Sequence, residues 1–132
     1  MNFDIDLKFG QSFENKVRDM LENDGTIEVK TERDIWKTTG NICFEYLYKG
    51  RPSGISTTDA KWWIHILADG DKIETGFIFP VEELRKKLKT WSQWGAKKVK
   101  GGDDNQSTML LIPIKWLVQT TEKGMVLKYE VD

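Results

Sequence analysis

The segment TIEVKTER alternates apolar and polar side chains and constrains the fold more than any other stretch of the chain. Ile27 and Val29 point to one side of an extended strand, because successive strand residues face opposite ways. Glu28, Lys30 and Glu32 point to the other side. The segment therefore predicts a half-buried β-strand that carries a row of charged side chains on its polar face.

Helical and extended periodicities take turns along the rest of the chain. Apolar residues recur at helical spacing over 11–22 and again over 80–91, where Pro80 occupies the first turn. We expect strands over 41–48, 63–68, 74–79, 109–113 and 125–131, a strand or arm over 2–9, a short helix from Thr57 or Thr58 to Trp62, and a polar loop over 95–107. This order predicts an α/β (α+β) fold, in which one domain, residues 1–132, has a mixed β-sheet flanked by helices.

Length and composition limit the classes of protein that the chain can belong to. Its 132 residues, 39% of them hydrophobic, suffice for one core and little more than one domain. The formal net charge of -1 does not by itself predict a nucleic-acid binder, so any basic surface must be local. The single cysteine, Cys43, excludes an intramolecular disulfide and suits a reducing compartment.

The sequence shows neither a signal-peptide pattern nor an apolar run of membrane-spanning length. We therefore expect a soluble, cytoplasmic protein with no membrane partner. The lone His65 argues against a histidine-rich zinc site and against a serine–histidine triad.

The polar face of the TIEVKTER strand places a carboxylate and an ammonium two residues apart. Glu28 and Lys30 project in the same direction. The carboxylate can hold a divalent cation, and the ammonium can stabilise the negative charge that grows on a scissile phosphate. A hard cation such as Mg²⁺ needs several oxygen ligands, so further acids are required. Taken alone, the same pair is also typical of a solvated strand face.

Two further glutamates are candidates for the same site. Glu14 lies beside the apolar stripe of the first helix, and Glu45 lies in the middle of the next strand on its less polar face. A half-buried carboxylate needs a partner, and a metal ion is one. The alternative is structural: Glu14 would pair with Arg18 one helical turn later, and Glu45 with Lys30 or Arg33 across strands.

Four sequence blocks follow one another in the order LKFGQSFENKV, IEVKTER, TGNICFEY and PSGISTTDAKWW, and GGDDNQSTMLLIPI comes after them. Together they resemble the PD-(D/E)XK nuclease superfamily, and within it the small phage-type endonucleases and Holliday-junction-resolvase-like enzymes. The resemblance covers most of the chain. It implies a restriction-endonuclease-like core with a site at the mouth of the antiparallel strands. It also implies hydrolysis of DNA phosphodiester bonds with Mg²⁺ or Mn²⁺.

The resemblance implies catalytic roles for four residues. Glu14 matches the helix glutamate, Glu28 and Lys30 match the Glu-x-Lys pair, and Glu45 matches the acid on the following strand. The three carboxylates are the expected metal ligands. No Pro-Asp precedes the strand at the usual spacing, so two registers remain. Either Glu28 takes the aspartate position and Glu45 the glutamate position, with Lys30 from the neighbouring strand. Or Glu28-Val29-Lys30 is the Glu-x-Lys motif itself, and Glu14 with Glu45 completes the metal shell.

Basic, hydroxyl and aromatic residues around the predicted strands are the expected DNA contacts. Cations and hydroxyls near a helix start can bind phosphate, and an exposed tryptophan between cations can stack on a base. The expected contacts are Arg33, Trp36, Lys37, Lys49, Arg51, Ser53, Thr57 and Thr58. For Trp36 the alternative is an indole folded back onto the core. A second basic stretch comprises Arg85, Lys86, Lys87, Lys89, Lys97, Lys98 and Lys100. This stretch either follows a phosphate backbone or forms a solvated surface.

The leading hypothesis is a metal-dependent DNA endonuclease, selective for DNA structure and, if phage-encoded, acting inside the host cell. A monomer without a separate recognition domain has little surface for reading sequence, and a homodimer would supply two sites. The alternative is a catalytically inactive module on the same fold that binds nucleic acid or protein, such as a phage modulator of a host complex. Metal-dependent cleavage separates the two hypotheses.

Overall fold

The computed structural model describes residues 3–24 and 26–118 of the chain. One sheet has the strand order β1–β4–β5, with β1 Ile27–Arg33, β4 Trp62–Asp69 and β5 Lys72–Pro80. Strand β1 runs parallel to β4, and β5 runs antiparallel to it, so this sheet is mixed. Lys30 is paired with His65 in the register of β1 and β4.

The other sheet has the order β3–β2–β7–β6 and is antiparallel throughout. Its strands are β2 Asn41–Tyr48, β3 Arg51–Pro52, β6 Lys97–Gly101 and β7 Ser107–Pro113. The expected single mixed sheet is therefore corrected to two sheets in the described part of the chain. Strand β2 pairs with β7, a segment far along the chain, and the alternation within a strand does not specify which strand will be its neighbour.

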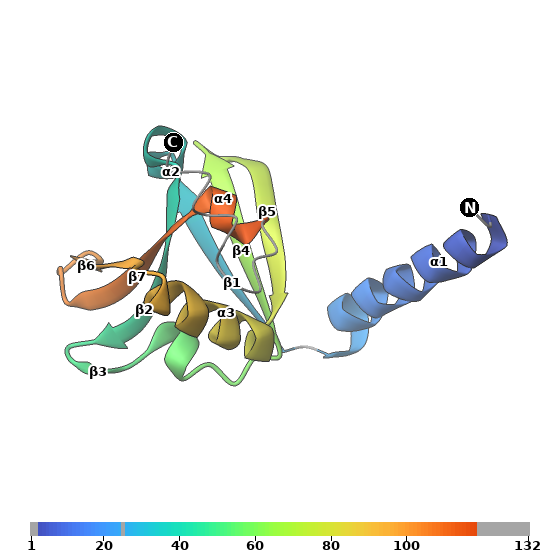
Figure 1. Ribbon diagram of the computed structural model, residues 1–132, viewed down its shortest axis with the longest axis horizontal. Helices are drawn as coiled ribbons and strands as arrows, with labels where there is room; N and C mark the ends of the chain where they lie inside the picture. The colour runs from blue at the N-terminus through green and yellow to red at the C-terminus, as the bar shows by residue number, and fades with distance from the viewer. Residues whose placement is uncertain (1–2, 25, 119–132) are drawn as a thin grey trace.

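Helical segments precede, connect and cover the strands (Figure 1). They are α1 Phe3–Asp19, the single π-helical turn η1 Met20–Asp24, α2 Ile35–Thr39, the 3₁₀ turn η2 Gly54–Ser56, α3 Val81–Gln93 and α4 Ile114–Leu117. In Figure 1, α1 extends away from the two sheets, whereas α3 lies across them. The fold is α+β, as predicted. No helix among the described residues is long and apolar enough to cross a membrane.

The strongest local signals correspond to observed elements. The hairpin expected over 63–68 and 74–79 is β4 and β5, and the helix expected over 80–91 is α3. Pro80, with φ of -61°, stands just before this helix, where its missing N–H costs nothing. The strand expected over 125–131 lies outside the described residues.

Three predicted segments are wrong in type. Residues 2–9 were expected as a strand or arm, but α1 already begins at Phe3. The short helix expected from Thr57 or Thr58 is absent, since residues 57–61 have no helix and Trp62 already begins β4. The polar loop over 95–107 contains β6, because three lysines do not prevent pairing with β7 at a sheet edge.

The core lies between the two sheets and α3. Val81, Leu84, Leu88 and Trp91 bury one face of α3 at helical spacing. From β2, the ring of Phe44 packs 4.7 Å from the ring of His65 and 6.3 Å from that of Trp63, measured between centroids. The inner face of β4 therefore contacts the second sheet directly.

Two apolar surfaces remain exposed. Phe9, Phe13 and Val17 of α1 and Leu21 of η1 recur every four residues, and each is between 45% and 64% exposed. We call this row the α1 stripe. On the first sheet, Val29 and Ile78 flank Ile64 in register and are themselves about half exposed. We call this surface the outer face, because alternation places it opposite Lys30.

Candidate functional site

A cavity of about 300 Å³ opens between the polar face of β1 and the second sheet. It is lined by Lys30, Thr31, Glu32, Cys43, Glu45, Trp63, His65 and Met109. The side chain of Lys30 is exposed, those of Glu32 and Glu45 are half-buried, and that of His65 is buried. The cavity thus combines one ammonium and two carboxylates with a buried aromatic wall.

A chain of hydrogen bonds fixes the carboxylate of Glu32. The indole N–H of Trp63 donates to Nδ1 of His65 at 3.1 Å, so Nδ1 must be the unprotonated nitrogen. Nε2 then carries the proton and donates to Oε2 of Glu32 at 2.5 Å. The backbone N–H of Cys43 donates to the same oxygen at 2.8 Å. Glu32 therefore links β1 to the strand β2 of the other sheet and cannot rotate freely.

The carboxylate of Glu45 is held by Ser107 of β7, and the backbone of Glu45 packs against the turn η2. Its Oε1 accepts a hydrogen bond from the hydroxyl of the buried Ser107 at 2.5 Å. The register between β2 and β7 shifts at Glu45. Behind it, Gly54 packs so closely that a Cβ there would lie 2.2 Å from the carbonyl oxygen of Glu45. The φ of Gly54, +54°, also favours glycine. Glycine is therefore required at position 54, where η2 packs against the backbone of Glu45.

The thiol of Cys43 borders the same cavity. Burial raises its pKa to about 11, and the negative charge of Glu32 raises it further in the same direction. A thiol with such a pKa is protonated at neutral pH and is a poor nucleophile. Cys43 thus lines the cavity as a protonated thiol and is not suited to act as a nucleophile there.

The structure brings together some of the predicted catalytic residues. Lys30 and Glu45 line the same cavity. Glu28 is half-buried on the same face of β1, beside Trp63, but it does not line the cavity. Glu14 lies on α1, in a hollow formed only by residues of α1 and η1. The described side chains therefore do not gather Glu14, Glu28 and Glu45 around one point.

No group of three histidine, cysteine or acidic side chains within 8–22 and 26–118 is close enough to share a metal ion. Two carboxylates, those of Glu32 and Glu45, do line one cavity. Mg²⁺ is commonly held by one or two carboxylates together with waters and substrate phosphates. The oxygen donors of the cavity fit that mode of binding and do not fit a cage formed by protein alone.

The predicted DNA contacts are divided between the two ends of β2. Lys37 and Trp36 lie on α2 at one end, whereas Lys49 and Arg51 lie at the β2–β3 turn at the other (Figure 1). The indole N–H of Trp36 donates to the carbonyl of Ala68 at 2.8 Å, and its ring packs against the core. Trp36 is thus held against the core, as in the structural alternative, and its role in base stacking stays a prediction.

The remaining predicted contacts differ in accessibility. Arg33, Arg51 and Thr57 are exposed. The hydroxyl of Ser53 is buried, so it cannot reach a phosphate at the surface. The hydroxyl of Thr58 accepts a hydrogen bond from the backbone N–H of Ala60, and Lys37 pairs with Asp69 at 2.8 Å. Burial and local pairing thus reduce the set of available DNA contacts.

The sequence reasoning missed Glu32 and His65 as site residues. For Glu32 the signal was present, because the alternation of TIEVKTER puts it on the same face as Lys30. For His65 no local signal exists, since its partner is 33 residues away in the sequence. Comparison of the chain with protein-family models, with curated proteins and with solved structures finds no match.

Proposed function

We propose that this chain is a metal-dependent nuclease that hydrolyses DNA phosphodiester bonds at the cavity of Lys30, Glu32 and Glu45. The observation that supports this proposal most is the shared cavity, which places one exposed ammonium beside two anchored carboxylates. The resemblance to the PD-(D/E)XK superfamily supports the same reaction.

Glu45 and Glu32 would hold Mg²⁺ or Mn²⁺, with Glu28 two residues away from Lys30 on the same strand face. When bound, such an ion lowers the pKa of a coordinated water and neutralises a phosphate oxygen. Lys30 would donate hydrogen bonds to the attacking water or to the phosphate oxygen on which charge develops. The bonds from His65 and Cys43 hold Glu32 in place during the reaction.

The site is tested by cleavage of branched, duplex and single-stranded DNA in Mg²⁺, in Mn²⁺ and in EDTA. Lys30→Met and Glu45→Gln should abolish metal-dependent cutting. Lys72→Met and Glu74→Gln, at exposed positions of β5, make the same changes of charge away from the cavity and should leave cutting unchanged. Full activity of Lys30→Met, or equal losses in the two control variants, would contradict the assignment.

A second candidate is a non-catalytic module that binds DNA or protein. The observation that favours it is that Glu14 and Glu28, two of the predicted metal ligands, do not line the cavity of Lys30. Such a module would bind DNA equally well in EDTA and in Mg²⁺, and Lys30→Met would change its affinity little. Fluorescence anisotropy with labelled DNA in both conditions separates this function from catalysis.

We also propose that two copies of the chain associate, with the α1 stripe of one copy on the outer face of the other. Both surfaces are apolar and exposed, and burying them against each other would remove apolar area from water. A helix the length of α1 spans about 25 Å, similar to the strands of the outer face. Light scattering should give the molar mass of a dimer for the wild-type chain. Val17→Glu places a charge in the stripe and should give a monomer. Asn15→Glu adds the same charge outside the stripe and should remain a dimer. A wild-type monomer at high concentration would exclude this association.

A further inference from the structure

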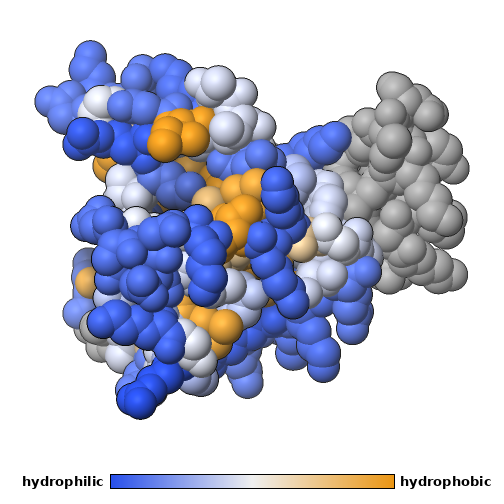
Figure 2. All heavy atoms as spheres, turned by 90° about the vertical axis from the view of Figure 1, so that its left-hand side faces the viewer, coloured by the Kyte–Doolittle hydropathy of each residue, from blue (hydrophilic) through white to orange (hydrophobic). Residues whose placement is uncertain are grey.

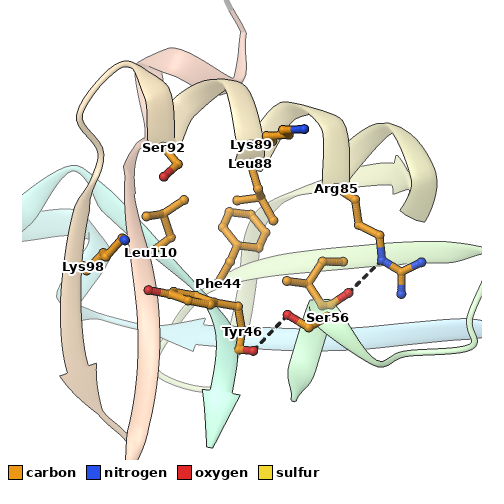
Figure 3. A pocket seen from close by; sticks show the side chains of 10 residues that line it. Phe44, Tyr46, Ser56, Arg85, Leu88, Lys89, Ser92, Lys98 and Leu110 are labelled. Carbon is orange, nitrogen blue, oxygen red and sulfur yellow. Dashed lines mark hydrogen bonds between the residues drawn. The ribbon is translucent and has the colours of Figure 1, made fainter. Parts of the chain in front are cut away.

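A second hollow, of about 430 Å³, lies between α3 and the second sheet (Figure 3). Phe44, Leu88 and Leu110 form its apolar floor, and all three belong to the hydrophobic core. Phe44 is fully buried, whereas Leu88 and Leu110 keep a small exposed fraction, so the hollow reaches down to the edge of the core. Concave apolar sites of this size hold small ligands in many proteins.

The hollow is separate from the cavity of Lys30. Phe44 and Tyr46 of β2 line the hollow, whereas Cys43 and Glu45 of the same strand line the other cavity. No described residue lines both sites, because alternate residues of β2 point to opposite faces of the strand. Binding in the hollow can be measured independently of any nuclease activity.

Polar groups from three elements line the hollow. Figure 3 shows the ammonium of Lys98 from β6, the hydroxyl of Tyr46 from β2 and the hydroxyl of Ser92 from α3 around Leu110. Each of these groups can donate a hydrogen bond to an anion. Together they would bind one negatively charged group at the edge of an apolar surface.

One end of the hollow is closed by Arg85. Its Nε donates to the carbonyl of Ile55 at 2.9 Å, and a terminal nitrogen donates to the carbonyl of Thr58 at 2.8 Å. The hydroxyl of Ser56 donates to the carbonyl of Tyr46 at 2.9 Å (Figure 3). These bonds fix the wall of the hollow, so its shape exists before any ligand binds.

All the charged side chains that line the hollow are positively charged. Arg85, Lys89 and Lys98 line it, and no acidic side chain does so among the described residues, although the whole chain has a net charge of -1. The face over β3 and β6 is mostly hydrophilic, with smaller apolar patches set between charged side chains (Figure 2). A ligand that matches this site has a flat apolar body and one anionic group.

We propose that this hollow binds a small planar aromatic anion, with its ring against Leu88 and Leu110 and its anionic group at Lys98. Two sources share this chemistry: a free nucleotide, which carries a base and a phosphate, and an aromatic carboxylate. The ring would bury apolar area, and the ammonium of Lys98 would supply the charge-assisted hydrogen bond.

The probe for the test is anilinonaphthalene sulfonate, an aromatic anion whose fluorescence rises in apolar surroundings. The full chain should bind one equivalent, with a Kd on the order of tens of micromolar for a ligand of this size. Lys98→Ala should weaken this binding about tenfold, which is the usual effect of losing one charge-assisted hydrogen bond. Ser92→Trp, at an exposed position of α3, should fill the hollow and abolish binding.

Lys97→Ala is the matched control, because Lys97 is the neighbouring exposed lysine of β6 and does not line the hollow. It removes the same charge from the chain and should leave the Kd within about twofold, since only distant electrostatics change. Equal affinity in all three variants, or no binding by the wild-type chain, would overturn the proposal. Circular dichroism of each variant shows whether it is folded.

Competition identifies the source of the ligand. Displacement of the probe by deoxyadenosine monophosphate, but not by uncharged deoxyadenosine, would identify a nucleotide site. Displacement by benzoate alone would identify a site for aromatic carboxylates. If neither anion displaces the probe, the hollow does not select aromatic anions and the proposal fails.

Discussion

Nε2 of His65 donates a hydrogen bond to Oε2 of Glu32 at 2.5 Å, and this contact joins the buried central strand β4 to the edge strand β1. The same carboxylate oxygen accepts the backbone N–H of Cys43, so it also joins the two sheets. His65 is 1% exposed and Glu32 is half-buried, and their hydrogen bond fixes the wall of the cavity.

Replacing His65 by phenylalanine should destabilise the fold by about 2–4 kcal/mol, because it leaves the buried indole N–H of Trp63 without its partner and removes one of the two hydrogen bonds to Oε2 of Glu32. Urea unfolding measures the loss. Combining His65→Phe with Glu32→Ala should cost less than the sum of the single changes, by about 0.5–3 kcal/mol. Strict additivity would show that the two side chains are not coupled. Glu74→Gln, at an exposed position, serves as the control.

Gly54→Ala should destabilise the fold more than Gly50→Ala, although both glycines have a positive φ. A Cβ at Gly54 would lie 2.2 Å from the backbone oxygen of Glu45, whereas nothing lies within 4 Å of a Cβ at Gly50, where φ is +77°. We expect a loss of about 2–4 kcal/mol at Gly54 and about 1 kcal/mol at Gly50, the cost of the left-handed backbone alone. Chemical denaturation compares them. Equal losses would mean that η2 moves away without penalty.

Cys43 should react slowly with iodoacetamide until the solution is strongly alkaline. Because burial raises its pKa to about 11, only about one thiol in a thousand is ionised at pH 8. The rate should rise with pH until about pH 11, while unfolded protein should reach its maximum nearer pH 9. A rate that levels off in the folded protein at pH 9 would contradict the assignment.

The same shift makes a prediction for stability. The folded chain holds the Cys43 proton more tightly than the unfolded chain, so this contribution to stability is fully present below pH 9 and is lost as the pH rises through about 11. Cys43→Ser should remove that part of the alkaline dependence. Unfolding measured at a series of pH values, with the wild-type chain beside the variant, tests this expectation.

The hydroxyl of Tyr48 donates a hydrogen bond to the carboxylate of Asp104. This bond raises the pKa of Tyr48 and lowers the pKa of Asp104. In Asp104→Asn, the ultraviolet absorbance of tyrosinate should therefore appear at a lower pH than in the wild-type chain. Asp103→Asn removes a neighbouring charge without that bond and should move the titration less. Identical titrations of the two variants would exclude the bond in solution.

Local patterns in the sequence predicted the parts of the fold that neighbouring residues decide. The helix α3 follows from Pro80 and from the spacing of Val81, Leu84 and Leu88. The face shared by Glu28, Lys30 and Glu32 follows from strict alternation in β1. The lysine-rich strand β6 had no such signal, since its extended form depends on pairing with β7.

The candidate site was predictable only in part, for the same reason. Lys30 and Glu45 were identified from the sequence, and they line one cavity. Glu32 lines the same cavity because β1 pairs in parallel with β4 and because its carboxylate accepts the backbone N–H of Cys43 on β2. No local pattern contains that arrangement, because it depends on which distant segments pair.

By itself, the sequence determined the α+β class, the main helices and strands and the polar face of β1, since each depends on side chains a few residues apart. The tertiary structure alone decided that there are two sheets in the described residues, that Glu32 binds His65, and that a cationic hollow opens beneath α3. Those features arise from contacts between segments far apart in the chain. Their free energies depend on packing and burial that no short stretch of sequence specifies.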